Sequence, residues 1–286
     1  MYEHGQPWTI VGPDGTVVDF NTLASVFKLE EVTGFDSARV RTSIEDRPEY
    51  DGAVAGNSFL GSRPVTMSGK VVAESAAARN LAVVQLQRAL RALRSDLTMK
   101  SQASGLPAMQ AGGRIESFRV SGGYVKEFQL GIVCADPRIY SQVLNSLTST
   151  AGAGSGLGAP WPIVWPAVWG GGSGAEQVVT VVNVGNIESP PVFRAYGPIT
   201  NPEIRNTTTG TSIWIDNLVL AVGEWVDVDV ANVTVVNHLG VNLYDRVRFP
   251  TSVWSLLSPG TNNLELRAVA SGSGVQLTVS WRDAWA

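Results

Sequence analysis

The feature that most constrains the fold is a stretch in the middle of the chain that consists mainly of glycine, alanine, proline, tryptophan and serine. It reads AGAGSGLGAPWPIVWPAVWGGGSGA over residues 151–175. Its prolines exclude a regular helix or a central strand, because proline has a fixed φ and no amide donor. The sequence therefore predicts two modules, 1–143 and 176–286, joined by a Gly/Pro/Trp-rich linker over 144–175.

The composition supplies enough apolar surface for both modules to fold. Hydrophobic residues make up 44% of the 286 residues and charged residues 16%, as expected for two domains of ordinary size. The net charge is −4; residues 1–140 are neutral and the acidic excess lies after them. This balance argues against a protein that binds nucleic acid by neutralising many phosphates.

Residue types that carry chemistry are sparse. Cys134 is the only cysteine, and its apolar surroundings predict a buried, unreactive thiol. His4 and His238 have no second ligand at zinc-binding spacing, and no nucleophile elbow, metalloprotease helix or phosphate-binding loop occurs. The N-terminus lacks the regions of a signal peptide, and no apolar run is long enough to span a membrane. We therefore predict no catalytic residue, metal, cofactor or membrane insertion.

The first module has the pattern of a β structure. Two apolar runs flank the turn Gly12-Pro13-Asp14-Gly15 and predict a hairpin. The polar, glycine-rich residues 45–62 predict an exposed loop. Strands are predicted at 8–20 (the hairpin), 27–32, 65–72, 112–120 and 124–134.

One long helix is predicted over 74–96, with Ser75 as its N-cap. Leucines at helical spacing form an apolar stripe, and arginines at every third residue lie near the C-terminal end, where the helix dipole favours positive charge. The leucines are Leu86, Leu90, Leu93 and Leu97, and the arginines are Arg88, Arg91 and Arg94. The arginines form either a solvated face or part of a contact surface between subunits.

The second module shows short strands separated by turn residues, without a helix pattern. Such spacing predicts a β-sandwich of the jelly-roll type. The strands are predicted at 177–184, 192–196, 212–216, 224–230, 233–236, 241–247, 263–270 and 274–281.

Two features in this half of the chain have a structural and a functional interpretation. We expect Trp161, Trp165 and Trp169 of the linker to pack on a domain or a neighbouring subunit, with a sugar-binding platform as the alternative. Asp227 and Asp229 share one face of a predicted strand. Paired carboxylates can hydrolyse glycosides or bind calcium, whereas alternation with valine is also the pattern of an ordinary half-exposed strand.

Several short motifs follow one another in a set order along the whole chain. In the first module they are the strand over 64–72, the long helix, and a strand through Phe128 that leads to Asp136-Pro137 and Tyr140. In the second they surround Pro191, Asn201, Gly210, Pro259, Gly260 and Asn262. In this order the chain resembles the distal tail proteins of long-tailed phages, a family of minor tail proteins.

The resemblance implies a fold, a location and partners. It implies a mainly β protein, with a tail-tube-like β-sandwich and one helix followed by a galectin-like jelly-roll. Such a protein is a structural part of the virion at the distal end of the phage tail. It forms a ring, usually a hexamer, that joins the tail tube protein to the baseplate or tail hub proteins. Genomic DNA crosses the lumen of that ring only in transit.

Two other functions remain open from the sequence. The tryptophans and the jelly-roll pattern also fit a glycan-binding module that contacts the host cell through the C-terminal β-sandwich. A β-sandwich hydrolase built on Asp227 and Asp229 is the enzymatic alternative. The long linker departs from the short one that the family implies.

Overall fold

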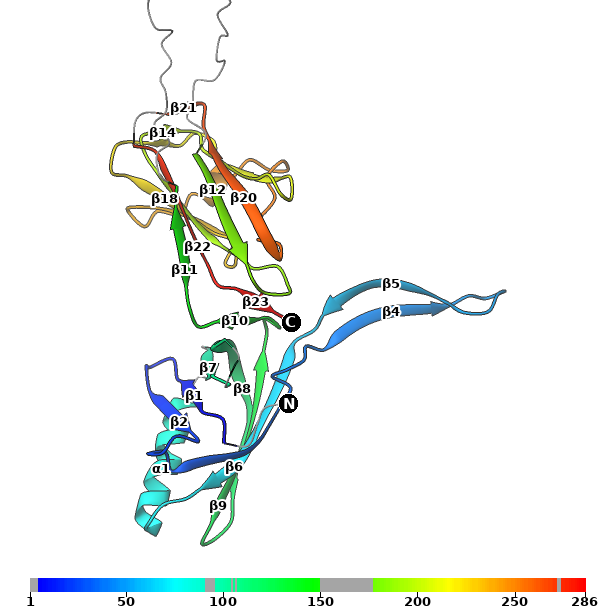
Figure 1. Ribbon diagram of the computed structural model, residues 1–286, viewed down its shortest axis with the longest axis vertical. Coiled ribbons are helices and arrows are strands. Elements are labelled where there is room, and N and C mark those ends of the chain that lie inside the picture. The colour runs from blue at the N-terminus through cyan, green and yellow to red at the C-terminus, as the bar shows by residue number, and fades with distance from the viewer. Residues whose placement is uncertain (1–4, 91–95, 104, 106, 150–176, 272–273) are drawn as a thin grey trace, which may run out of the picture. The chain divides into compact units, whose positions relative to one another are not determined.

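A computed structural model describes residues 5–90, 96–103, 105, 107–149, 177–271 and 274–286 (Figure 1). They form two compact units, one comprising Met1–Gln142 with Trp285–Ala286 and the other comprising Val143–Ala284. Strands dominate both units and the described residues contain one α-helix, so the mainly β fold predicted from the sequence is confirmed. This helix is too short to cross a membrane.

The first unit is built on one large sheet whose strand order is β23-β10-β8-β7-β1-β2-β3-β6-β9. Because β8 pairs with β9 as well as with β7, the sheet closes on itself. The predicted hairpin is β1–β2, in which Trp8 pairs with Phe20. The strands are β1 (Trp8–Val11), β2 (Val17–Phe20), β3 (Phe27–Thr33), β4 (Val40–Asp46), β5 (Ala53–Leu60), β6 (Arg63–Val71), β7 (Leu97–Ser101), β8 (Met109–Ser121), β9 (Lys126–Cys134), β10 (Ile139–Ser141) and β23 (Ala284–Trp285).

Helix α1 (Ala76–Ala89) packs against β2 and β6. It begins as predicted, because the Ser75 hydroxyl accepts a hydrogen bond from the amide of Ala78. Leu86 and Leu90 are buried, but Leu97 is not part of the helix. Leu97 begins β7, whose alternating buried residues pair with β1 and β8. The helix ends at Ala89, with Leu90 as its C-cap, so the predicted end at 96 is wrong. Leu93 lies outside the described residues.

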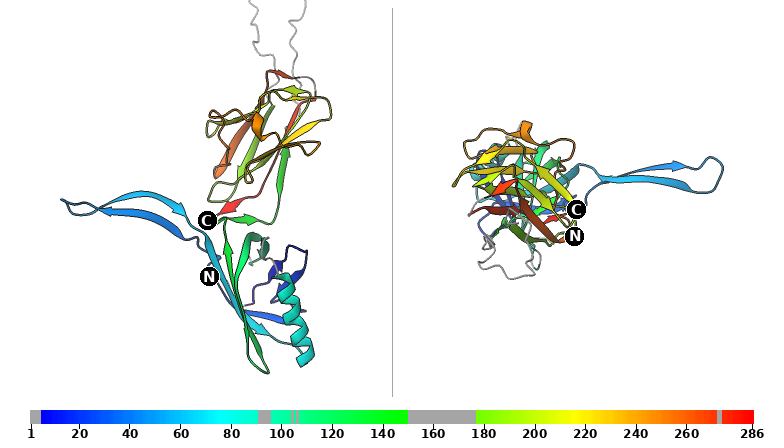
Figure 2. Two further views of the ribbon diagram at one scale, coloured as in Figure 1. Left: turned by 180° about the vertical axis from the view of Figure 1, so that it is seen from behind. Right: turned by 90° about the horizontal axis from the view of Figure 1, so that it is seen from above.

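The prediction of a loop over 45–62 is also wrong. Strands β4 and β5 pair only with each other and leave the main sheet as a two-stranded ribbon (Figure 2). Nearly every residue of the ribbon is exposed. Its two faces therefore lack the contrast between buried apolar and exposed polar positions by which a strand is recognised in a sequence.

The second unit is a sandwich of two antiparallel sheets. Their orders are β11-β22-β13-β18-β19 and β12-β20-β15-β16, and a small third sheet is ordered β17-β14-β21. Apolar side chains from both larger sheets, such as Phe193, Val279, Ile204 and Leu264, meet in one fully buried core. The strands are β11 (Asn145–Thr148), β12 (Gln177–Asn183), β13 (Val192–Tyr196), β14 (Ile199–Thr200), β15 (Glu203–Asn206), β16 (Thr211–Trp214), β17 (Val219–Leu220), β18 (Trp225–Asp229), β19 (Thr234–Asn237), β20 (Gly260–Arg267), β21 (Ala270–Ser271) and β22 (Gln276–Trp281).

Two expectations about this half differ from the structure. Residues 145–148, placed in the linker by the sequence, form β11 and pair with β22, so that Asn145 lies opposite Trp281. Residues 241–247, expected as a strand, contain instead a single 3-10 turn, η1 (Tyr244–Arg246). Asn242 and Val247 form only isolated bridges, to Val236 and Ile215, so no continuous strand develops. The rest of the predicted linker lies outside the described residues.

Candidate functional site

The described residues contain no group of three or more side chains that could hold a metal ion. Asp227 and Asp229 do share one face of β18, as the sequence predicts, but each carboxylate has a structural partner. Asp227 accepts two hydrogen bonds from the guanidinium of Arg194, at 2.6 and 2.8 Å, and this contact raises the pKa of Arg194. Asp229 accepts hydrogen bonds from the backbone and side chain of Asn232. The pair of carboxylates therefore stabilises strand and turn geometry.

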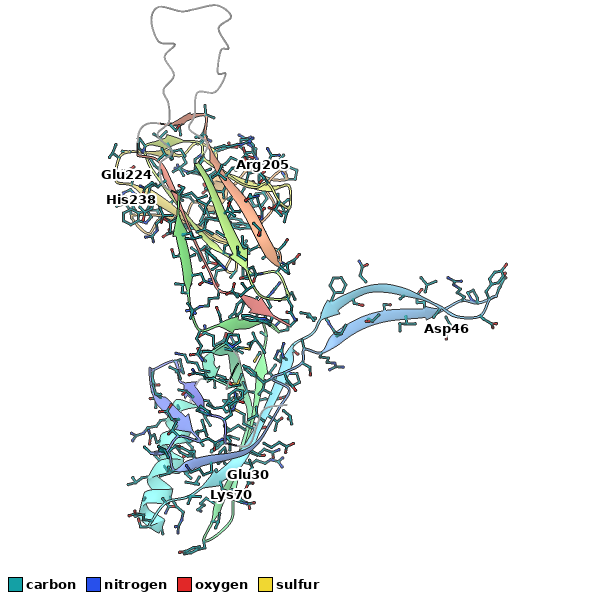
Figure 3. The ribbon with its side chains drawn as sticks, in the orientation of Figure 1. Glu30, Asp46, Lys70, Arg205, Glu224 and His238 are labelled. Carbon is teal, nitrogen blue, oxygen red and sulfur yellow. The ribbon has the colours of Figure 1, made fainter. Side chains whose placement is uncertain are left out.

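A row of side chains crosses the same sheet beside these carboxylates. Trp225 lies between Tyr196 and His238, with ring centroids 6.2 and 5.7 Å away, and the guanidinium of Arg194 lies 5.2 Å from its centroid. His238 approaches Glu224 with 3.6 Å between Nε2 and Oε1 (Figure 3). One face of the indole is thus covered by a cation, an arrangement that stabilises the sheet through cation–π contact.

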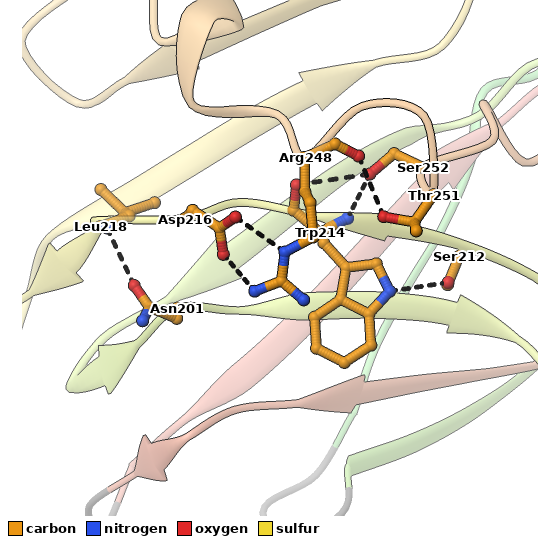
Figure 4. A network of polar contacts seen from close by, with 8 residues as sticks. All are labelled: Asn201, Ser212, Trp214, Asp216, Leu218, Arg248, Thr251 and Ser252. Atoms are coloured by element: carbon orange, nitrogen blue, oxygen red, sulfur yellow. Dashed lines mark hydrogen bonds and ion pairs between the residues drawn. The ribbon is translucent and has the colours of Figure 1, made fainter.

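A second network joins β16 to the loop after η1 (Figure 4). The Arg248 guanidinium donates hydrogen bonds to both carboxylate oxygens of Asp216 and lies 4.7 Å from the centroid of Trp214. The hydrogen bond from Arg248 lowers the pKa of Asp216. The Trp214 backbone amide donates to the hydroxyl of Ser252, at 3.0 Å. These contacts fasten a long loop to the sandwich.

A third partly exposed tryptophan of the sandwich lies in the same loop. Trp254 stacks on Tyr244, with ring planes 8° apart and centroids separated by 6.2 Å. Trp214, Trp225 and Trp254 therefore all have an aromatic or cationic neighbour over or beside the ring. Nothing in this geometry favours a sugar platform, and glycan binding stays a prediction.

In the first module, the motif residues Asp136, Pro137 and Tyr140 lie in the segment that follows β9, and the buried side chain of Arg63 binds this segment. Arg63 is fully buried and donates from Nε to the carbonyl of Pro137, and from Nη1 to the carbonyl of Phe35, both at 2.7 Å. Asp136 accepts hydrogen bonds from the amide of Arg138 and from the hydroxyl of Tyr140. Burial, reinforced by the neighbouring Asp136 carboxylate, raises the pKa of Tyr140. Phe128, the other motif position, lies in the aromatic core near Phe20 and Phe27.

The motif positions of the second unit hold loops in place. Asn262 is fully buried and binds the turn that contains Pro259, donating to the carbonyls of Ser258 and Gly260 at 2.8 and 3.1 Å. Asn201 has a positive φ of 49°, and its side chain accepts a hydrogen bond from the amide of Leu218. The carbonyl of Pro191 accepts a hydrogen bond from the amide of Val230 at the end of the β13–β18 pair, and Gly210 has a positive φ.

Of the residues predicted to take part in assembly, the structure describes only Arg88. Arg88 is exposed near the C-terminal end of α1. Arg91, Arg94, Trp161, Trp165 and Trp169 lie outside the described residues. The exposed side of α1 also carries Leu81 and Val84, whose side chains are 71% and 43% exposed.

Sequence reasoning missed the most prominent surface of the first unit, the ribbon of β4 and β5, which we call the arm (residues 40–60). Val40, Ile44, Val54 and Phe59 of the arm are all more than half exposed. An isolated two-stranded hairpin is at best marginally stable in water, and exposed apolar side chains mark contact surfaces. The sequence signal for the arm was a pair of short runs on either side of a polar turn, Val40–Asp46 and Ala53–Leu60.

Comparison with known proteins agrees with this architecture of two β units. Residues 184–285 match the family described as siphovirus-type tail component, C-terminal domain. The second unit is therefore similar to the C-terminal domain of that family of phage tail components. Comparison with curated proteins finds no match.

Solved phage proteins share the fold over nearly the whole chain. The SPP1 Dit (gp 19.1) protein, described as a paradigm of the hub adsorption apparatus in phages that infect Gram-positive bacteria, is 17% identical. The match covers 98% of this chain and 99% of that chain, with a TM-score of 0.67. Chains of the phage P2 baseplate in its activated conformation with Ca and with Sr are 11% and 12% identical. Both matches cover 96% of this chain and 97% of the other, with TM-scores of 0.55 and 0.53. The resemblance to phage distal tail proteins is thereby confirmed.

Proposed function

We propose that this protein is a structural component of a phage tail tip, located in the virion at the distal end of the tail. There it forms a ring, a hexamer in our proposal, that joins the tail tube to the baseplate or tail hub and leaves a lumen for DNA. The observation that carries the proposal is the fold: both units match the SPP1 hub protein along almost the full length of both chains.

The described residues support a structural role over a catalytic one. Their ion pairs and buried polar groups close turns and fasten loops, as Asn262, Arg63 and Arg194 show. The first unit also presents exposed apolar surface on the arm and on α1, which an assembly would cover. We assign ring formation to the first unit, with Arg88, Arg91 and Arg94 in the contact surface. We also assign the linker residues Trp161, Trp165 and Trp169 to subunit contacts.

The first unit has a charge balance that suits a conduit. Residues 1–140 carry no net charge, and a lumen rich in lysine and arginine would slow DNA because each neutralised phosphate adds affinity. The tail tube protein and the hub proteins are the partners that the proposal requires on the two sides of the ring.

Purified full-length protein tests this function. Its mass should be measured by light scattering over a wide concentration range, and its particles should be imaged by electron microscopy. We expect closed rings with an open centre. A protein that stays monomeric at high concentration and shows no rings would refute the proposal.

A further inference from the structure

The two faces of the arm differ in chemistry. Thr42 pairs with Ser58 and Ile44 pairs with Ala55, so two steps along β4 correspond to three steps along β5. The extra residue is a bulge in β5, and the side chains of β4 alternate between the two faces of the arm without interruption. Val40, Thr42, Ile44 and Asp46 therefore share one face, which we call the apolar face of the arm. It is completed from β5 by Ala53, Ala55, Ser58 and Leu60. The opposite face carries Arg41 and Glu45 beside Phe59 and Val54.

Asp46 is the only charged residue on the apolar face. It stands at the outer end of the face, beyond Ile44, which is 65% exposed, and Val40, which is 59% exposed (Figure 3). In the middle of the face, the hydroxyl groups of Thr42 and Ser58 form a hydrogen bond with each other, 2.9 Å long. The face is thus a narrow apolar strip with one terminal negative charge.

Helix α1 presents a strip of the opposite sign. Ala77, Leu81, Val84 and Arg88 follow i, i+4, i+7 and i+11 spacing and are exposed on one side of the helix. Residues 76–89 include no acidic residue, and Arg88 is the exposed cation at the end of the strip. We call this strip the outer face of α1.

The two strips have matching lengths and charge positions. At about 3.4 Å per residue the strand spans about 20 Å from Val40 to Asp46, and at 1.5 Å per residue the helix spans about 17 Å from Ala77 to Arg88. From the last apolar residue to the charge the spacing is about 7 Å on the arm and about 6 Å on the helix. Apolar contact and the ion pair can therefore form in the same register.

We propose that the apolar face of the arm docks on the outer face of α1 in a second copy of this chain, with Asp46 beside Arg88. Within one copy, Ile44 and Leu81 are both largely exposed, so neither strip covers the other. An interface between two different surfaces of the same protein is heterologous, and its repetition gives a ring when the rotation closes. The inference rests on the proposed ring and names the surfaces that build it.

Charge reversal in the full-length protein tests the docking. Asp46→Arg and Arg88→Glu are exposed substitutions that should each weaken association by about tenfold or more per interface, because like charges then face each other. The double variant Asp46→Arg/Arg88→Glu should restore association to within about threefold of the wild type. Glu45→Arg makes the same charge change on the opposite face of the arm and is the matched control, for which we expect wild-type rings.

The possible results distinguish a failure of the proposed docking from a failure of the proposed function. If the wild type forms rings and both single reversals assemble equally well, the docking is wrong while the proposed function stands. If Glu45→Arg disrupts rings as strongly as Asp46→Arg, or the double variant fails to recover, the docking is also overturned. If the wild type forms no ring at all, the proposed function and the docking fall together.

A cysteine pair gives an independent readout. In Ile44→Cys/Val84→Cys the two thiols should approach across the interface, and mild oxidation should produce a ladder of covalent oligomers on a denaturing gel. Ser43→Cys/Val84→Cys places the first thiol on the other face of the arm and should give no ladder. Equal cross-linking of the two variants, or none in a protein that forms rings, would overturn the docking.

Discussion

Removing the Asn262 side chain should destabilise the second unit strongly, although this residue touches no proposed partner. Asn262 is fully buried, and its amide donates to the carbonyls of Ser258 and Gly260 while its oxygen accepts from the amide of Ser258 at 3.0 Å. Each of these three hydrogen bonds contributes about 1 kcal/mol net, and all three are lost with the side chain. We therefore expect Asn262→Ala to lower the free energy of unfolding by about 3 kcal/mol.

The size of this loss makes it measurable by heating. A unit of about 140 residues unfolds with an entropy of about 0.3 kcal/mol/K, so about 3 kcal/mol corresponds to a fall in Tm of about 10 °C. Differential scanning calorimetry of the full-length protein gives Tm, and urea titration gives the free energy. Asn263→Ala removes the next side chain, which is exposed and accepts one hydrogen bond from Thr180; its effect should stay near 0.5 kcal/mol or below.

A near-isosteric variant separates hydrogen bonding from packing. Asn262→Asp keeps the acceptor for the Ser258 amide but turns an oxygen toward two carbonyls, so the ionised carboxyl is disfavoured in the folded state. Its folded pKa should exceed the unfolded value, and the variant should therefore recover stability as the pH falls. The reasoning is refuted if Asn262→Ala and Asn263→Ala lose equal stability, or if the aspartate variant shows no such pH dependence.

The remaining predictions concern Arg63, Cys134 and Gly185. Arg63→Met should lower the stability of the first unit by about 2–4 kcal/mol in urea titration, because the carbonyls of Pro137 and Phe35 lose a charged donor; the transition of the second unit should not move. Burial raises the pKa of the Cys134 thiol to about 11, so the native protein at pH 8 should not react with a thiol reagent that labels it in urea. The pKa of the Cys134 thiol is about 9 in the unfolded chain and about 11 in the native protein. Ionisation of this thiol should therefore lower the stability of the native protein as the pH rises from about 9 to about 11. Gly185→Ala places a Cβ against the Ala284 carbonyl oxygen and should lower the Tm of the second unit, as calorimetry would show.

Local sequence patterns were sufficient to predict those segments that have one buried and one exposed side. The β6 strand alternates strictly between buried and less buried residues, and the Ser75 cap begins α1 as the sequence predicts. The same contrast identified β13 and β18. Such segments can be recognised from their own sequence, because a half-buried strand has an apolar residue at every second position.

The missed elements lack that contrast or depend on distant partners. The arm is exposed on both faces, so its sequence reads as a loop. Strand β11 has a short polar sequence and exists because it pairs with β22, which lies more than 120 residues further along the chain. The motif positions were predicted by resemblance, but their roles as clamps follow from contacts such as that between Arg63 and Pro137.

By itself the sequence determined the mainly β class and the position of the helix start. These depend on residue type and short-range spacing, which proline, glycine and alternating apolar residues express directly. Only the tertiary structure decided which apolar residues stay exposed, as Ile44 and Leu81 do, and which polar residues are buried, as Arg63 and Asn262 are. Burial is a property of what the rest of the chain covers, and no short window of sequence contains that information.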